Sequence, residues 1–116
     1  RDTWLDEAIT QWYDGVAHGS QFVPLEETYS GNWVGARSPT SVGFSRLAYS
    51  DGARIMQWLA ARLGGTDRMR AFLRYVHERY AFRPFTTLEF VGFVRDFAGI
   101  DVQSQFERWL YQGGGR

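Results

Sequence analysis

The sequence predicts an all-α fold, a bundle of about five helices, from its composition and from two patterns along the chain. Of its 116 residues, 44% are hydrophobic and 17% aromatic, which is enough for one domain with a buried core. Apolar residues recur at the three- and four-residue spacings of amphipathic helices. Glycines and helix-capping residues separate these stretches. We therefore expect residues 1–116 to form a single helical domain or subdomain, with a long irregular loop at about 19–44.

The first helix is predicted from an apolar stripe near the N-terminus. The stripe comprises Leu5, Ala8, Ile9, Trp12 and Val16. At about 100° per residue, Glu7 lies roughly opposite this stripe, with Gln11 and Asp14 beside it. Spacing alone favours a solvated helix face as the explanation of Glu7. Gly15 and Gly19 favour fraying of the helix before it reaches His18.

The loop predicted at residues 19–44 is rich in Gly, Pro, Ser, Asn and Thr. An irregular connection of this length in a compact domain is usually functional or mobile. It carries four aromatic residues, Phe22, Tyr29, Trp33 and Phe44. Two interpretations remain open: these side chains cover an edge of the core, or they line the apolar walls of a peptide cleft.

The next two predicted helices meet at Gly64-Gly65. The first runs from about Ser45 to Leu63, where the glycine pair ends it. Its apolar stripe comprises Ile55, Met56, Leu59 and Leu63. Thr66 is predicted to cap the following helix. The stripe of that helix comprises Met69, Phe72, Leu73, Val76 and Tyr80, while Arg68, Arg70 and Arg74 mostly face water.

The fourth and fifth helices have the clearest start signals. Thr86 and Glu89 form a capping box, and Phe85 and Phe90 form the matching hydrophobic staple. This helix should end at Gly99. Its buried face comprises Phe90, Phe93, Val94 and Phe97. Asp101 is predicted to cap the last helix, whose buried side comprises Val102, Phe106, Trp109 and Leu110.

Charge and cysteine content exclude several function classes. Thirteen basic and thirteen acidic residues cancel, so we expect no nucleic-acid partner and no electrostatic attraction to membranes. The sequence has no Cys, which rules out disulfides and thiolate metal sites. No apolar run approaches the ~18 residues of a transmembrane helix, so we expect no membrane span in this chain.

Several short blocks, in order, resemble one protease family. Trp4-Leu5-Asp6-Glu7-Ala8, followed by an aromatic pair, is similar to the Trp-Leu-Asn-Glu-Gly block of the aminopeptidase N-like zinc peptidases, the gluzincins. Tyr49-Ser50-Asp51-Gly52 resembles their Tyr-x-Lys-Gly block. The similarity continues through Leu63-Gly64-Gly65, Phe72-Leu73-Arg74-Tyr75, Thr86-Thr87-Leu88-Glu89-Phe90, Gly99-Ile100-Asp101 and Trp109-Leu110-Tyr111-Gln112-Gly113. The resemblance thus covers nearly the whole chain.

The resemblance implies that the chain is the helical back half of a thermolysin-like catalytic domain, cut from a zinc metalloaminopeptidase that hydrolyses peptides. Glu7 would be the third zinc ligand, and Tyr49 would donate a hydrogen bond to the oxyanion of the tetrahedral intermediate. The two histidine ligands belong to an H-E-x-x-H motif outside this chain. His77-Glu78 only begins like that motif, because Ala81 takes the second histidine position. The rest of the catalytic domain would pack on the Glu7 face, and the isolated chain should be inactive and bind no zinc tightly.

Other interpretations stay open beside this one. Asp6, Ala8 and Asp51 depart from the family pattern, which has Asn, Gly and Lys there, and keep a non-enzymatic helical interaction module or pseudo-peptidase as the alternative. Tyr49 lies near the edge of an apolar stripe, so it is also a candidate core residue. A self-contained metal site on the first helix, from Glu7, Asp14 and His18, is the weakest hypothesis. The sequence leaves the substrate-binding residues undefined.

Overall fold

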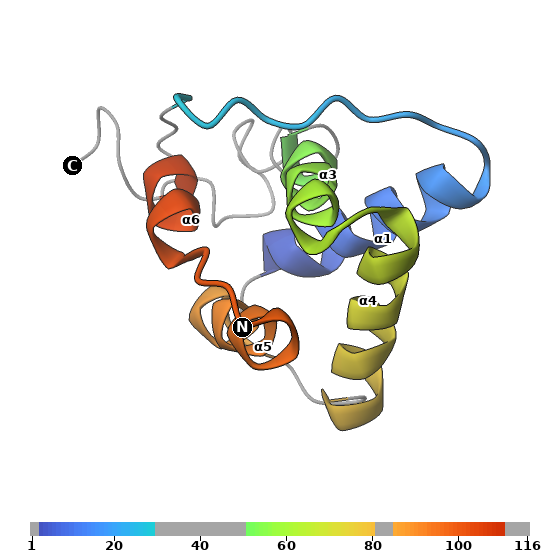
Figure 1. Cartoon of the computed structure of the whole chain (residues 1–116). Coiled ribbons are helices and arrows are strands. Elements are labelled where there is room, and N and C mark those ends of the chain that lie inside the picture. Colours follow the sequence, from blue (N-terminus) through green and yellow to red (C-terminus); the bar gives the residue numbers. More distant parts are fainter. Residues whose placement is uncertain (1–2, 30–50, 81–84, 111–116) are drawn as a thin grey trace.

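A computed structural model of the chain describes residues 3–29, 51–80 and 85–110. Five α-helices and no β-strand lie within these ranges, which confirms the predicted all-α bundle (Figure 1). The helices are α1 (Thr3–Ala17), α3 (Gly52–Leu63), α4 (Thr66–Tyr80), α5 (Thr87–Ala98) and α6 (Gln103–Leu110).

Helix α3 contributes the most buried residues and packs against α1 and α4, while α4 also packs against α5. Its buried residues are Gly52, Ala53, Ile55, Met56, Trp58, Leu59, Ala60 and Leu63. Large aromatic side chains complete the core: Trp12, Phe72, Phe90, Phe106 and Trp109 are all less than 2% exposed. Phe90 and Phe106, from α5 and α6, stack with ring centroids 6.2 Å apart. One apolar core therefore connects the described helices.

Both ends of α5 agree with prediction, and the side chain predicted to cap α6 binds its first residue from one position further upstream. The Thr86 hydroxyl accepts a hydrogen bond from the backbone N–H of Glu89, whose carboxylate accepts one from the backbone N–H of Thr86. The Phe85 and Phe90 rings stack at 6.2 Å, and Gly99 ends the helix with a φ of 74°. The Asp101 carboxylate accepts a hydrogen bond from the backbone N–H of Gln103. The Val102 carbonyl, however, accepts the first-turn bond from the Phe106 N–H, so Asp101 lies one residue before the cap position. These helix starts are thus stabilised by the side chains expected from the sequence.

The junction between α3 and α4 differs in one respect from prediction. Gly64 ends α3 in the left-handed region, at a φ of 116°, as expected. Thr66, however, is already the first residue of α4, and the Gly65 carbonyl accepts the first-turn bond from the Met69 N–H. The predicted Thr66 cap is therefore wrong, and Gly65 occupies the cap position. The predicted start of the preceding helix near Ser45 lies outside the described residues.

An extended segment after α1, residues 20–29, runs across α3 toward α6; we call it the strap (Figure 1). Leu25 at its centre is buried at 4% exposure. Phe22 and Tyr29 are partly buried against the core, so these two loop aromatics cover a core edge. Trp33 and Phe44 lie outside the described residues. The part of the predicted 19–44 loop that the structure describes is irregular, as expected, but it is bound to the helices.

Candidate functional site

Glu7 lies at the margin of the core and not on a fully solvated face. Its side chain is half-buried, because the buried arc of α1 extends further round the helix than the sequence indicated. Trp4 is buried at 8% exposure, whereas Ile9 at the other edge is only partly buried. Trp4 and Glu7, three residues apart, are neighbours on the helix surface. The Glu7 side chain is therefore less exposed than its predicted position opposite the apolar stripe indicated.

Two tryptophans fix the rotation of α1 within the bundle. The Trp4 indole N–H donates to the Thr87 hydroxyl of α5 at 3.0 Å, and this pair is buried. The Trp12 indole N–H donates to the Gln57 side-chain oxygen of α3 at 2.9 Å. Since each bond links α1 to a different helix, they hold the direction in which Glu7 projects. Within the described ranges no hydrogen bond or ion pair engages the Glu7 carboxylate.

The structure does not assemble a metal site from the other candidates on α1. Helix α1 ends at Ala17, and His18 is exposed. The His18 ring nitrogen Nδ1 lies 2.8 Å from the Asp14 carbonyl oxygen and 3.6 Å from its carboxylate. Among the described residues, no three His, Asp or Glu side chains gather closely enough to hold a metal ion. Of the candidate ligands on α1, Glu7 is the one held at the core margin.

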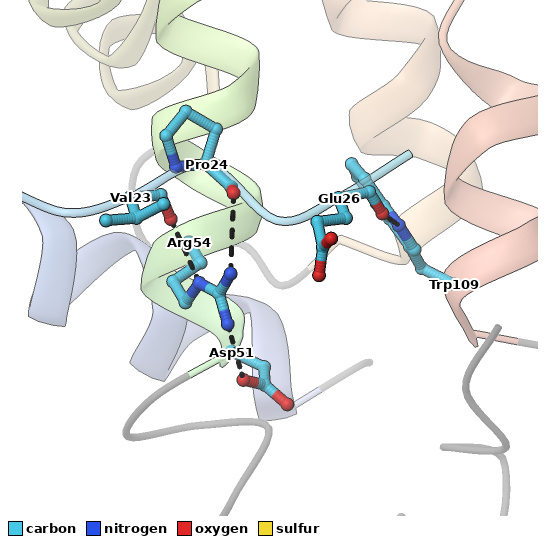
Figure 2. Close-up of polar contacts among 6 residues, drawn as sticks. All are labelled: Val23, Pro24, Glu26, Asp51, Arg54 and Trp109. Carbon is cyan, nitrogen blue, oxygen red and sulfur yellow. Dashed lines mark hydrogen bonds and ion pairs between the residues drawn. The ribbon is translucent and has the colours of Figure 1, made fainter. Parts of the chain in front are cut away.

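Tyr49, the other candidate, lies outside the described residues, but the residues just after it are described. Asp51 is buried at 6% exposure and occupies the position before the first residue of α3. Its carboxylate lies 3.8 Å from the Arg54 guanidinium. Figure 2 shows this pair at the start of α3, beside the strap. The chain two residues after Tyr49 is therefore held within the bundle.

Arg54 also binds the strap, and sequence reasoning missed this role. Its Nε donates to the Val23 carbonyl at 3.0 Å, and a terminal nitrogen donates to the Pro24 carbonyl at 3.5 Å (Figure 2). Its own carbonyl accepts from the Leu25 N–H at 3.2 Å. One residue thus joins the strap, which follows the helix that carries Glu7, to the residues that follow Tyr49.

Two tryptophans bind the other end of the strap. The Trp58 indole N–H donates to the Glu27 carboxylate at 2.8 Å, and the Trp109 indole N–H donates to the Glu26 carbonyl at 2.9 Å (Figure 2 shows the second). The two rings pack edge to face, with centroids 5.0 Å apart. The sequence predicts only that each buried tryptophan needs an acceptor for its indole N–H. It does not predict that Glu26 and Glu27 of the strap supply the acceptors.

Comparison of this chain with known proteins identified no relative. No protein family, curated protein or solved structure matches this chain. In the ranges that the structure describes, no helix has both the length and the apolar content needed to cross a bilayer.

Proposed function

We propose that this chain is the C-terminal part of a gluzincin-type zinc aminopeptidase catalytic domain. In this proposal Glu7 supplies the third zinc ligand and Tyr49 donates to the developing oxyanion. The observation that supports it best is the placement of Glu7. Its carboxylate is half-buried on a helix whose rotation is fixed by Trp4 and Trp12, and it has no partner in the described part of the chain. A preoriented carboxylate of this kind suits a ligand better than a solvated surface residue.

The described residues can supply one ligand of a zinc site, Glu7, but not a complete site. Catalytic zinc normally has three protein ligands, which His and Glu side chains supply. Since no group of three gathers in the described ranges, the two histidines would come from an H-E-x-x-H helix packed on the Glu7 side of α1. Bound zinc would act as a Lewis acid and lower the pKa of water for attack on the peptide carbonyl.

Tyr49 would act in the transition state of peptide hydrolysis. A phenol hydroxyl aimed at the carbonyl oxygen stabilises the negative charge that develops there, and contributes less to ground-state binding. The Asp51–Arg54 pair and the strap hold the chain two residues beyond Tyr49. This arrangement gives Asp51 a structural role in place of the Lys that is usual in the family. A catalytic role for Tyr49 and a role in core packing are compatible.

The second candidate is a helical interaction module that keeps the family's helices without its chemistry. The substitutions at Asp6, Ala8 and Asp51 favour it, and so does the open groove between α1 and α4 described below. The two candidates differ in whether the parent protein retains zinc through Glu7.

The test is the zinc content of the parent protein carrying Glu7→Gln or Glu7→Ala. We expect both variants to lose zinc, because neither side chain supplies the anionic oxygen ligand. Thermal unfolding of the zinc-free proteins should differ from wild type by no more than about 0.5 kcal/mol, since Glu7 is outside the core cluster. Asp14→Asn, which alters an exposed carboxylate on the same helix, is the matched control and should retain zinc. Full zinc occupancy in the Glu7 variants would contradict the proposal, and a wild-type parent without zinc or activity would favour the interaction module.

A further inference from the structure

An open groove lies between α1 and α4, away from Glu7. Its floor is formed by Ile9, Tyr13 and Leu73, and it has a volume of about 320 Å³. A second hollow of about 420 Å³ shares Ile9 and Tyr13 and continues along α1 past Thr10, Asp14 and Ala17. Tyr13 stands between the two hollows and is 48% exposed, although it is a large aromatic residue. Because Ile9 and Tyr13 line both hollows, the two adjoin each other along α1.

The edge of the groove on α4 carries two guanidinium cations and one imidazole. Arg70, Arg74 and His77 line it, at positions i, i+4 and i+7 of one helix face. Of the two arginines, Arg70 has one acidic partner, Asp67 at 3.7 Å, whose side chain is fully exposed to solvent. Such a pair is screened by water and neutralises little of the charge. Within the described ranges, no ion pair or ring contact engages Arg74.

The remaining arginines of α4 serve the fold instead. Arg68 stacks over the Phe97 ring with its guanidinium carbon 4.4 Å from the ring centroid. Arg79 stacks over Tyr75 at 4.6 Å. By helical position, these two lie on the side of α4 opposite to Arg70 and Arg74. Helix α4 therefore separates arginines that cover aromatic rings of α4 and α5 from arginines that border an apolar groove.

We propose that the α1–α4 groove binds an acidic amphipathic segment of a partner protein. Apolar side chains of the segment would fill the hollows on either side of Tyr13, and its carboxylates would lie along Arg70, Arg74 and His77. Charge complementarity selects this occupant, because an apolar floor with a cationic edge favours carboxylates flanking apolar anchors. Asp14, beside the second hollow, disfavours a carboxylate there and so sets the orientation. Tyr13 lies about 120° from Glu7 around α1, so the groove between α1 and α4 faces away from the proposed zinc site, whereas the second hollow reaches Asp14, which lies two turns beyond Glu7 on nearly the same side of the helix.

The test uses the purified chain and two synthetic fluorescent peptides. Both carry Leu and Phe at helical i, i+3 and i+7 positions; one has Glu at the flanking positions and the other has Lys there. By fluorescence anisotropy we expect the Glu peptide to bind at least about tenfold more tightly than the Lys peptide, and to weaken as salt is raised. The double variant Arg70→Gln/Arg74→Gln should weaken the Glu peptide about tenfold, and Tyr13→Ala should weaken both peptides. Arg68→Gln/Arg79→Gln removes the same charge from the other face of α4 and should leave the affinity unchanged.

Circular dichroism of each variant establishes that it is folded before binding is compared. Absence of binding by the Glu peptide, equal binding of the two peptides, or equal losses in the groove and control variants would each overturn the proposal. Because the measurement needs neither zinc nor Glu7, failure of peptide binding is distinguishable from failure of the peptidase proposal.

Discussion

Single buried polar contacts determine how the helices and the strap are oriented in this molecule. Four described tryptophans are buried, and the indole N–H of each donates to an oxygen: Trp4 to Thr87, Trp12 to Gln57, Trp58 to Glu27 and Trp109 to Glu26. Leaving any of these donors without an acceptor would carry a desolvation penalty. The partners lie 31 to 83 residues away in sequence, so spacing did not predict them. The half-burial of Glu7 was missed for the same reason, because it follows from the docking of Trp4.

A first prediction at this scale concerns Tyr49. In the parent protein, Tyr49→Phe should lower kcat by about 10²-fold or more, with zinc content and KM nearly unchanged. Loss of one oxyanion donor removes transition-state stabilisation and little else. Tyr75→Phe, which removes the hydroxyl from a tyrosine of α4, is the control and should keep full activity. Steady-state kinetics on a peptide substrate measure both, and full activity of the Tyr49 variant would assign Tyr49 to packing alone.

Individual helices were predicted well where the determining contacts are local. The start of α5 is set by residues three to five apart, and its capping box and staple are both present. The sequence prediction placed the start of α4 one residue too late. Gly64 and Gly65 both have positive φ values, and Thr66 after them already lies in the first turn of the helix. The strap was not predicted, since it has no periodic pattern and depends on Arg54, Trp58 and Trp109 from other elements.

These two threonines give a matched test at the scale of the helix. Thr86→Ala should destabilise the chain by about 1 kcal/mol, because it removes the acceptor for the Glu89 N–H. Thr66→Ala should change stability by no more than about 0.5 kcal/mol, since Thr66 lies within the first turn and does not occupy the cap position. Urea unfolding with an unchanged m value measures both. Equal losses in the two variants would mean that the assignment of the α4 cap position is wrong.

At the scale of the whole molecule, the all-α architecture was predicted from the sequence and is confirmed, whereas the candidate site stays a prediction. The helices repeat apolar residues at helical spacing, and a bundle is the arrangement that buries such stripes together. Glu7 was placed on the correct helix but on a face more exposed than the one it occupies. Tyr49 lies outside the described residues, so its role stays a prediction. The proposed zinc site needs two histidines from outside this chain, so it cannot be completed from the described residues.

The last prediction concerns the isolated 116-residue chain, which should fold as a helical domain yet retain no zinc and cleave no peptide. Its core joins all the described helices, and this favours folding without the rest of the parent. In the proposal Glu7 supplies one ligand where three are normally needed, and no group of three lies in the described ranges. After exposure to zinc and exhaustive dialysis, elemental analysis should find far less than one zinc per chain, and an aminoacyl-anilide should stay intact. The parent protein in the same assays should retain about one zinc and cleave the substrate. Stoichiometric zinc or cleavage by the isolated chain would mean that its own residues complete a site, and that the two histidines assigned to the parent are not required.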